Sequence, residues 1–324
     1  MAKKNSHLIY YIKAFSLLLT PAWVLRQKER RILAAYERRA DKAAIDARVN
    51  YYNRLSEVVA LPEECRSLCH HTYKEHKSSS VYFFDTFEFT RYFPKEFVWS
   101  HEPGDVVHLF DVPTVVKTRP LCQKDPRFAN SILLNLDKVR HFLFVKDPIP
   151  LAAKSPVVLF RGAVHGKPAR LKFLEMFMGK PGFDVGDTSG KLDASLQGKT
   201  LSINEHFKYR YVMALEGNDV ASNLKWVMSS NCIAVMPRPT CESWFMEGQL
   251  RPNYHYIEIK PDFSDLEERI HYYNEHLDEA QAIVEHAHEY VSQFLDAERE
   301  RIVSYLVMRK YFSKTSVNGK PQLS

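Results

Sequence analysis

A strand–turn–helix–strand pattern between Tyr209 and Tyr256 constrains the fold of this 324-residue chain more than any other feature. Residues 209–215 are aromatic and apolar, as in a buried strand. Residues 220–229 then predict a helix, and residues 232–236 predict a second strand. This order is typical of a βαβ unit, in which a helix joins two parallel strands.

The turn between the first strand and the helix is the part of this unit that could bind a ligand. It reads Glu216-Gly217-Asn218-Asp219, in which Gly217 and Asn218 can adopt positive φ at little cost. Asp219 is the predicted cap of the helix. Backbone N–H groups at a helix start bind anions, so a nucleotide phosphate is one interpretation of this turn. An ordinary crossover without a ligand is the other.

A second turn between a strand and a helix lies earlier in the chain. Residues 156–160, PVVLF, predict a buried strand that leads directly into Arg161-Gly162. Glycine lets the backbone approach a diphosphate, and arginine offers it a planar fork of donors. A surface ion pair is the alternative role for Arg161.

The composition limits the class of protein. Hydrophobic residues make up 45% of the chain and charged residues 26%, which suits two α/β lobes with packed cores. The net charge of +6 favours anionic partners such as nucleotides, phosphorylated glycans or acidic lipid. The cations are scattered and the sequence has no nucleic-acid-binding motif, so we expect no nucleic acid partner.

The N-terminal segment, residues 1–48, bears on localisation. Its apolar run from Leu8 to Leu25 is interrupted by Lys13 and Pro21 and has basic residues on both flanks. Lys13 makes a membrane-spanning helix costly, and no signal-peptide cleavage site is obvious. We therefore expect a helix that lies on an anionic membrane, with a spanning helix and a helix packed on the protein itself as alternatives.

The cysteines bear on redox compartment and metal binding. Five cysteines are an odd and sparse set, which favours free thiols in a reducing compartment over a disulfide framework. Two of them, Cys65 and Cys69, precede His70 and His71, but the spacing matches no standard zinc pattern. We expect no metal.

Several short motifs follow one another between residues 50 and 294. The first two are Gly104-Asp105-Val106 and the segment 113–120, PTVVKTRP. The others are Phe160–Gly162, Lys208-Tyr209, Leu215–Gly217, Ala221-Ser222, Glu242–Phe245, Leu250–Pro252, His255-Tyr256 and Asp262–Leu266. In order and spacing, these motifs resemble glycosyltransferase family 90, which includes bacterial lipopolysaccharide-core glycosyltransferases and eukaryotic protein O-glucosyltransferases.

The resemblance implies an α/β fold of the GT-B type, with two Rossmann-like lobes and a cleft between them. We expect the acceptor-side lobe at residues 49–150, and the UDP-sugar-binding lobe with a long closing helix at residues 151–312. The polar tail, residues 313–324, is expected to be disordered. The family also implies an inverting transfer without a metal, and the chain contains no Asp-X-Asp triplet, the usual metal clamp of the other glycosyltransferase fold.

The resemblance also implies a donor site. Arg161 would hold the UDP diphosphate, and Gly162 would allow its close approach. The further residues implied in donor binding are Gly217, Ala221, Ser222, Asn223, Lys225 and Glu242. Asn223 stands where eukaryotic members carry a second arginine, so Lys225 is expected to supply that cation. Glu242 would contact donor hydroxyls or only cap its loop.

The catalytic base is implied by position alone. Asp105 best matches the catalytic aspartate of the eukaryotic members, although the segment that follows it differs in length. Inverting transfer needs one carboxylate within reach of the acceptor hydroxyl. Asp85, Glu88 and Asp111 are competing candidates, and a carboxylate that caps its own turn is the alternative role for Asp105.

Together these features predict transfer of glucose or galactose from a UDP-sugar to the core oligosaccharide of lipopolysaccharide, a lipid-linked acceptor. We expect a peripheral protein on the cytoplasmic face of a bacterial inner membrane. One alternative is a transferase of the same family that acts on capsule or protein. The other is a non-catalytic, membrane-associated scaffold, which the missing second arginine favours.

Overall fold

The computed structural model describes residues 7–323, and the chain folds into two compact units. Unit 1 contains residues 141–240 and 247–293. Unit 2 contains the described residues before 141, residues 241–246 and the residues from 294 onward. The chain therefore enters unit 1 twice, and the short loop at 241–246 belongs to unit 2.

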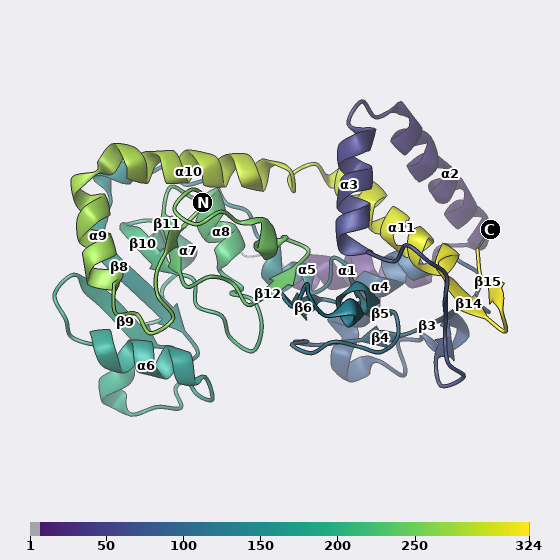
Figure 1. Ribbon diagram of the computed structural model, residues 1–324, viewed down its shortest axis with the longest axis horizontal. Helices are drawn as coiled ribbons and strands as arrows, with labels where there is room; N and C mark the ends of the chain where they lie inside the picture. The colour runs from purple at the N-terminus through teal and green to yellow at the C-terminus, as the bar shows by residue number, and fades with distance from the viewer. Residues whose placement is uncertain (1–6, 324) are drawn as a thin grey trace. The chain divides into compact units, whose positions relative to one another are not determined.

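Unit 1 is built around a five-stranded parallel sheet in the order β13-β11-β10-β8-β9 (Figure 1). The strands are β8 (Ser155–Gly162), β9 (Phe183–Asp187), β10 (Tyr209–Met213), β11 (Ile233–Met236) and β13 (Ile257–Glu258). Every residue of β11 is buried, as in a parallel sheet that is covered on both faces. The βαβ unit predicted at residues 209–236 is confirmed, because β10 and β11 pair in parallel.

Helices pack against this sheet. They are α6 (Pro168–Phe177), α7 (Ile203–His206), α8 (Leu224–Ser229), α9 (Leu266–Glu275) and α10 (Leu277–Ser292). The buried residues of α10 recur at the spacing of one helical face, and they are Ala280, Ile283, Val284, Ala287 and Val291. This face lies over α8 and β11.

Unit 2 combines five longer helices with small sheets. The helices are α1 (His7–Leu18), α2 (Ala22–Arg38), α3 (Lys42–Tyr52), α4 (Ser80–Thr90) and α11 (Ala297–Ser313), with the short α5 (Lys138–His141) at the boundary of the unit. A parallel sheet contains β4 (His101–Glu102), β5 (Thr114–Val116) and β7 (Ser131–Leu133). Two antiparallel pairs are β2 (Arg66–Ser67) with β3 (Val98–Trp99), and β6 (Thr118–Pro120) with β12 (Cys241–Ser243).

The C-terminal region differs from the prediction in two ways. The expected continuous helix is interrupted after α10, and α11 starts afresh at a cap in which Asp296 accepts hydrogen bonds from two backbone N–H groups. α11 packs on α2, α3 and α4 in unit 2, so it does not close over the sheet of unit 1. The tail is ordered as β14 (Thr315–Val317) and β15 (Lys320–Pro321), because β14 finds a parallel partner in β1 (Val59–Ala60).

The length and hydrophobicity of the N-terminal helices bear on the membrane prediction. Within residues 7–323, no single helix is long and apolar enough to cross a membrane. The segments His7–Leu18 and Trp23–Arg38 reach that length and hydrophobicity only when the two are counted together, and they are bent by 112° relative to each other.

Candidate functional site

The candidate site lies at the carboxyl ends of β8 and β10 in unit 1. The chain runs from β8 outward to β9 and then returns to the other side of β8 as β10, so the direction of strand order reverses between these two strands. Open α/β sheets bind ligands at such a switch point, beyond the carboxyl ends of the strands. Here β8 ends at Gly162, and β10 is followed by the turn with Gly217.

Arg170, in the first turn of α6, bridges the two strand ends. Its Nη1 donates to the carbonyl of Ala163 at 3.0 Å, on the β8 side. On the β10 side, Nε donates to the carbonyl of Glu216 at 3.0 Å and Nη2 to that of Leu215 at 2.6 Å. A guanidinium has five N–H groups, and the two others have no partner within the described residues. They are available to a ligand at the switch point.

No carboxylate in the described part of the chain neutralises this arginine. Burial lowers the pKa of Arg170, which reports the cost of holding an unpaired cation away from water. Glu216, whose backbone carbonyl accepts from Arg170, has its carboxylate engaged elsewhere, since it accepts hydrogen bonds from Thr240 N at 2.9 Å and Thr240 Oγ1 at 2.6 Å. A bound anion would supply the missing counter-charge.

Two glycines leave room beside Arg170. A Cβ on Gly217 would lie 3.2 Å from Arg170 Nη2 and 3.4 Å from Lys167 Cε. A Cβ on Gly162 would lie 3.6 Å from Arg170 Nη1. Neither glycine has a left-handed φ, so the predicted use of positive φ at Gly217 is wrong, and the same holds for Asn218. The absence of a side chain, rather than a special backbone conformation, is what the site requires of Gly217.

An apolar cavity of about 190 Å³ adjoins this cationic corner. Its walls come from the turn after β10, from the chain after β11 and from the segment around Phe263. The apolar and small lining residues are Ala169, Ala214, Leu215, Val220, Ala221, Leu224, Met236, Pro237, Pro239, Pro261 and Phe263. An apolar slot beside unpaired cations suits a ligand with one flat, weakly polar end and one anionic end.

Arg161 lies away from this corner. Its Nη2 pairs with the carboxylate of Asp184, and its Nη1 donates to the carbonyl of Asp184 at 2.8 Å. Asp184 stands opposite Leu159 in the β8–β9 register, so the guanidinium points back along the sheet from its own position at 161. Nε is bound to the carbonyl of Lys199 at 2.9 Å. In this arrangement Arg161 fastens β8 to β9, and Arg170 is the arginine that contacts both strand ends.

The turn after β10 also differs from the prediction. The helix begins at Leu224 rather than at Val220, and Asn223 is its cap residue. Asn223 Nδ2 donates to the carbonyl of Met213 at 2.9 Å, which ties the turn to the end of β10. Ala221 is buried against the apolar cavity and Ser222 is exposed, so these two predicted residues lie at the edge of the site.

Lys225 is buried, and its partner Glu247 lines the apolar cavity. Its Nζ lies 2.6 Å from Glu247 Oε1, and both side chains are almost completely buried. The cation predicted to replace the second arginine is therefore already paired inside unit 1. Lys167, which precedes α6 and lies beside Gly217, is the second cation of the site in its place.

Glu242 lies in the core of unit 2. It is fully buried, its Oε1 accepts from Arg119 Nε at 2.8 Å, and its Oε2 accepts from the hydroxyl of Tyr51. The pair sits on neighbouring strands, because Glu242 of β12 is opposite Arg119 of β6. This arrangement gives Glu242 an internal partner and no exposed edge for donor hydroxyls.

Asp105, the predicted base, is partly exposed in unit 2. It follows Gly104, whose φ of +111° forms the turn after β4. The carboxylate pairs with Lys117 and lies 3.5 Å from Arg140 Nη2, and 24% of its side chain is exposed. Arg140 also binds Asp137, with 2.7 Å between Nε and Oδ2. Asp105 thus belongs to a charged cluster that solvent and a hydroxyl can reach.

The competing carboxylates are placed differently. Asp85 is buried, accepts from the hydroxyl of Tyr10 at 2.9 Å, and has a pKa that burial raises to about 6. Glu88 is paired with Lys138 at 2.6 Å. Asp111 is 90% exposed and lies 3.8 Å from Arg127. Glu88 shares with Asp105 a fixed cation and a partly exposed side chain, at 34% against 24%, whereas Asp85 is buried and Asp111 is 90% exposed.

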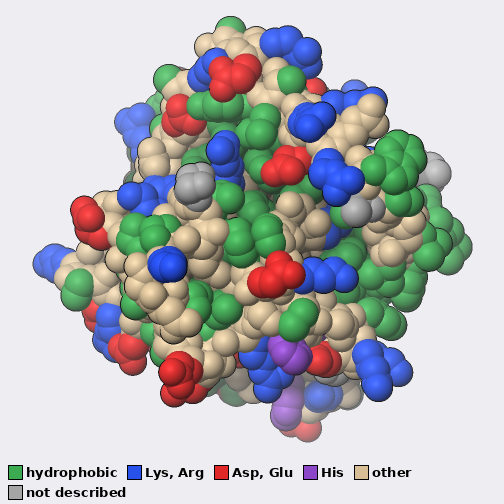
Figure 2. Space-filling view, turned by 90° about the vertical axis from the view of Figure 1, so that its right-hand side faces the viewer, with side chains coloured by type: hydrophobic (Ala, Val, Ile, Leu, Met, Phe, Trp, Pro, Cys, Tyr) green, Lys and Arg blue, Asp and Glu red, His purple; other side chains and the backbone are tan. Residues whose placement is uncertain are grey.

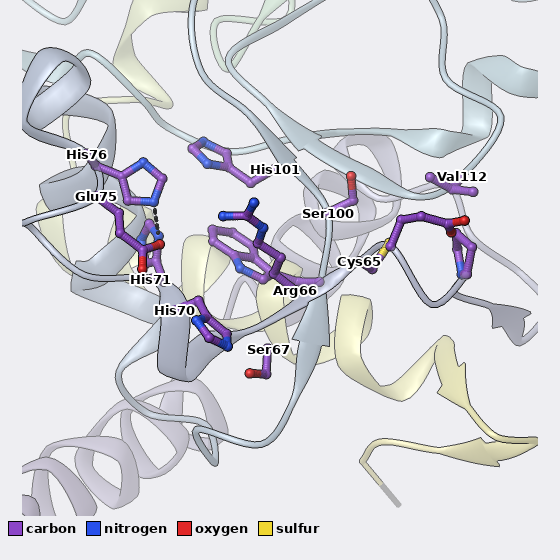
Figure 3. Close-up of a pocket in the computed structure, with 13 residues that line it drawn as sticks. Cys65, Arg66, Ser67, His70, His71, Glu75, His76, Ser100, His101 and Val112 are labelled. Carbon is purple, nitrogen blue, oxygen red and sulfur yellow. Dashed lines mark hydrogen bonds between the residues drawn. The ribbon is translucent and has the colours of Figure 1, made fainter.

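A second pocket, of about 420 Å³, lies in unit 2 around the cysteine–histidine segment (Figure 3). Figure 3 shows His71 and His76 joined by a hydrogen bond, which is 3.2 Å long, with His101 and Arg66 facing them across the pocket. In the part of the chain that the structure describes, no group of three or more His, Cys, Asp or Glu side chains is arranged to hold a metal ion. The expectation of a metal-free protein stays a prediction.

Sequence reasoning did not select Arg170 and Lys167. The signal available was the run Lys167-Pro168-Ala169-Arg170, in which proline marks the first turn of a helix and two cations flank it. Basic residues in a first helical turn are unfavourable for the helix dipole, which indicates that they serve something other than the helix.

Comparison with known proteins identifies the family of the chain. The model of glycosyl transferase family 90 matches residues 143–318, more than half of the chain. O-glucosyltransferase LpsA of Dichelobacter nodosus is 40% identical over 308 residues, 94% of each chain. Human protein O-glucosyltransferase 3 is 27% identical over 126 residues, which cover 39% of this chain and 24% of the human protein. The chain belongs to glycosyl transferase family 90.

Proposed function

We propose that this glycosyltransferase moves a hexose from a UDP-sugar to the core oligosaccharide of lipopolysaccharide, with inversion and without a metal ion. The observation that carries the proposal is Arg170, a cation without a carboxylate partner in the described chain, held between two glycines at the switch point of a parallel sheet. The sequence relationship to an O-glucosyltransferase favours glucose over galactose as the transferred sugar.

In this proposal the donor nucleotide lies along the carboxyl edge of the sheet in unit 1. The diphosphate occupies the space over Gly162 and Gly217 and receives the two remaining N–H groups of Arg170, with Lys167 as the second cation. The uridine occupies the apolar cavity beside Ala221. Unit 1 is then the donor lobe and unit 2 the acceptor lobe of a GT-B architecture, which the Rossmann-like strand order of unit 1 supports.

The chemical step needs one base and stabilisation of the leaving group. Asp105 takes the proton of the acceptor hydroxyl, and the hydroxyl oxygen forms a bond to the anomeric carbon from the face opposite the diphosphate. The bond from that carbon to the diphosphate oxygen breaks, and the electron pair leaves with UDP. Arg170 and Lys167 stabilise the negative charge that develops on UDP, which is the task that a metal performs in other glycosyltransferases.

The test is calorimetric titration of UDP into the wild-type protein and Arg170→Ala, first without added metal and then with excess chelator. We expect binding that survives the chelator and weakens about 10- to 100-fold in Arg170→Ala, the range for one charge-assisted contact. Lys180→Ala is the matched control, because Lys180 is a 43% exposed cation of the same unit that pairs with Glu267 and lies outside the cavity lining.

Three results would redirect the proposal. Absence of UDP binding by the wild-type protein would favour the scaffold hypothesis. Binding that requires a divalent metal would remove the metal-free step. Tight UDP binding without glucose transfer to truncated lipopolysaccharide, but with transfer to capsule or protein acceptors, would keep the donor site and replace the acceptor.

A further inference from the structure

The first helix exposes a hydrophobic face. Among the described residues, twelve large hydrophobic side chains are exposed, and seven of them fall within residues 8–23. They are Leu8, Ile9, Ile12, Phe15, Leu18, Leu19 and Trp23, with exposed fractions that reach 71% for Leu8 and 83% for Leu19. Figure 2 shows hydrophobic side chains gathered along one edge of the face that it draws. An apolar cluster of this density marks an interaction surface.

The exposed face is not a core face that has lost its partner, because α1 already packs on α4 through its other side. Tyr10 donates to Asp85 Oδ1 at 2.9 Å, and Ala14 is buried against Phe83 and Phe84. The hydroxyls of Tyr11 and Ser80 are 3.0 Å apart. α1 is therefore attached to unit 2, with its outward orientation fixed.

The outward residues form a continuous stripe. Leu8, Ile12 and Phe15 follow the spacing i, i+4 and i+7, which places them on one side of α1, and Leu19 directly follows the helix. Phe15 is 42% exposed, and its ring also packs on Tyr73 and Phe84. In a helix that faces water this stripe would be polar. Trp23 follows the stripe at the start of α2, and tryptophan is enriched at the boundary between lipid and water.

Five exposed cations lie on the same two helices. Lys13 is exposed on α1, and Arg26, Lys28, Arg30 and Arg31 are exposed on α2. α1 contains no acidic residue, and no ion pair within the described residues engages these five cations. An apolar stripe with lysine and arginine nearby is complementary to an anionic lipid surface. The apolar side chains match the acyl chains, and the cations match the anionic headgroups.

We propose that the stripe on α1, with the adjoining cations of α2, docks unit 2 onto an anionic lipid bilayer without crossing it. The side chains from Leu8 to Trp23 enter the boundary between headgroups and acyl chains, and the cations stay at the level of the headgroups. This surface is separate from the donor site, so the proposal does not depend on the proposed transfer reaction. In this proposal the lipid bilayer binds the protein directly and independently of the sugar donor and acceptor.

Trp23 provides a direct probe. It is 65% exposed, whereas Trp99, Trp226 and Trp244 are buried. Vesicles of phosphatidylglycerol and phosphatidylcholine should shift the tryptophan emission to the blue and sediment with the protein, and vesicles of phosphatidylcholine alone should do so much more weakly. Trp23→Phe should remove the blue shift and retain the sedimentation.

Two triple variants separate this surface from hydrophobicity in general. Leu8→Ser/Ile12→Ser/Leu19→Ser should weaken vesicle partition by about tenfold or more, since three inserted side chains are lost. Val58→Ser/Leu277→Ser/Leu295→Ser removes three exposed hydrophobic residues elsewhere and should bind vesicles as the wild type does. Calorimetric UDP binding by both variants would show that unit 1 is intact, and an unchanged circular dichroism spectrum would show the same for the chain as a whole.

Several outcomes would overturn the proposal. These are equal binding to neutral and anionic vesicles, unchanged binding by the α1 variant, or no blue shift in the wild type. A dimer in light scattering that the α1 variant converts to a monomer, with no vesicle binding by the wild type, would assign the stripe to a second copy of the chain instead.

Discussion

Lys225 and Glu247 form an ion pair in the interior of unit 1, with 2.6 Å between Nζ and Oε1 and at most 1% of either side chain exposed. Lys225 comes from α8, which follows the predicted phosphate turn, and Glu247 comes from the chain that re-enters unit 1. The pair therefore joins the two segments of unit 1, and the lysine serves the fold.

The first prediction concerns this pair. Lys225→Met should lower the free energy of unfolding by about 3–5 kcal/mol, because Glu247 is left as an uncompensated buried charge. The double variant Lys225→Met/Glu247→Leu should recover most of the loss, since neither charge remains to be desolvated. Urea unfolding measures both. A Lys225→Met protein that is as stable as the wild type but binds UDP poorly would instead place Lys225 in the donor site.

The second prediction concerns Gly217. Its backbone conformation is one that alanine can adopt, and a Cβ there would lie 3.2 Å from Arg170 Nη2. Gly217→Ala should therefore displace the guanidinium and fill the space over the turn, which weakens UDP binding about tenfold or more with little loss of stability. Asn218→Ala, at the exposed next position, is the control and should bind UDP normally. Equal UDP affinities of the two variants would contradict a diphosphate site over Gly217.

The sequence predicted the strands and the turn of the candidate site, but it did not single out Arg170. Strand β10, strand β11 and the turn at Gly217 follow from local composition, because a run of apolar residues and a polar turn with glycine are short-range signals. The direction in which an arginine side chain points, by contrast, does not follow from its neighbours in the sequence. Arg161 and Arg170 both lie between a strand and a helix in the sequence pattern. Only the packed structure shows that Arg161 pairs with Asp184, and that Arg170 donates to backbone carbonyl groups instead.

Pairs that are far apart in the sequence were likewise not predictable. Glu242 and Arg119 are 123 positions apart, and a buried carboxylate looks like a ligand-binding one until its partner is known. The tail was predicted to be disordered because it is polar, yet backbone pairing of β14 with β1 does not depend on side-chain hydrophobicity. Both errors arise where a long-range partner overrides the local signal.

The third prediction concerns the chemical step. Asp105→Asn should lower the rate of sugar transfer by about 10²- to 10⁴-fold, the usual contribution of a general base, and leave UDP affinity unchanged because Asp105 belongs to unit 2. Asp111→Asn is the matched control, since Asp111 is 90% exposed in the same unit. Initial rates with a truncated lipopolysaccharide acceptor measure the difference, and calorimetry measures UDP binding. A transfer rate that falls in Asp111→Asn rather than in Asp105→Asn would move the base to Asp111.

The fourth prediction is a loss of stability in acid that depends on His101. Burial, together with the neighbouring His76, lowers the pKa of His101 to about 3, whereas an unfolded histidine titrates near 6.5. Below about pH 6.5, His101 becomes protonated in the unfolded chain but stays neutral in the folded chain. The stabilising contribution is therefore complete above that pH and is lost as the pH falls towards 3, by up to about 1.4 kcal/mol per pH unit.

Other groups titrate in this range and must be separated from His101, among them His71, Asp85 and His255, whose pKa burial lowers to about 4. His71 acts with the same sign, because burial lowers its pKa to about 2. Asp85 acts with the opposite sign, because burial raises its pKa to about 6, so its contribution improves as the pH falls from 6 towards 4. Comparison of His101→Gln with the wild type at each pH removes the contribution of Asp85, whereas His71 responds to the variant because His101 is one of the groups that lower its pKa.

The measurement is urea unfolding at several pH values between 7 and 4. His101→Gln should be less stable than the wild type at pH 7, since it loses the stacking of His101 on Trp99. Its stability should then fall less steeply with acid, so that the two curves converge. His271→Gln is the control, because His271 is 75% exposed and should give a curve parallel to the wild type. A parallel curve for His101→Gln would show that His101 is protonated as easily in the folded chain as in the unfolded one.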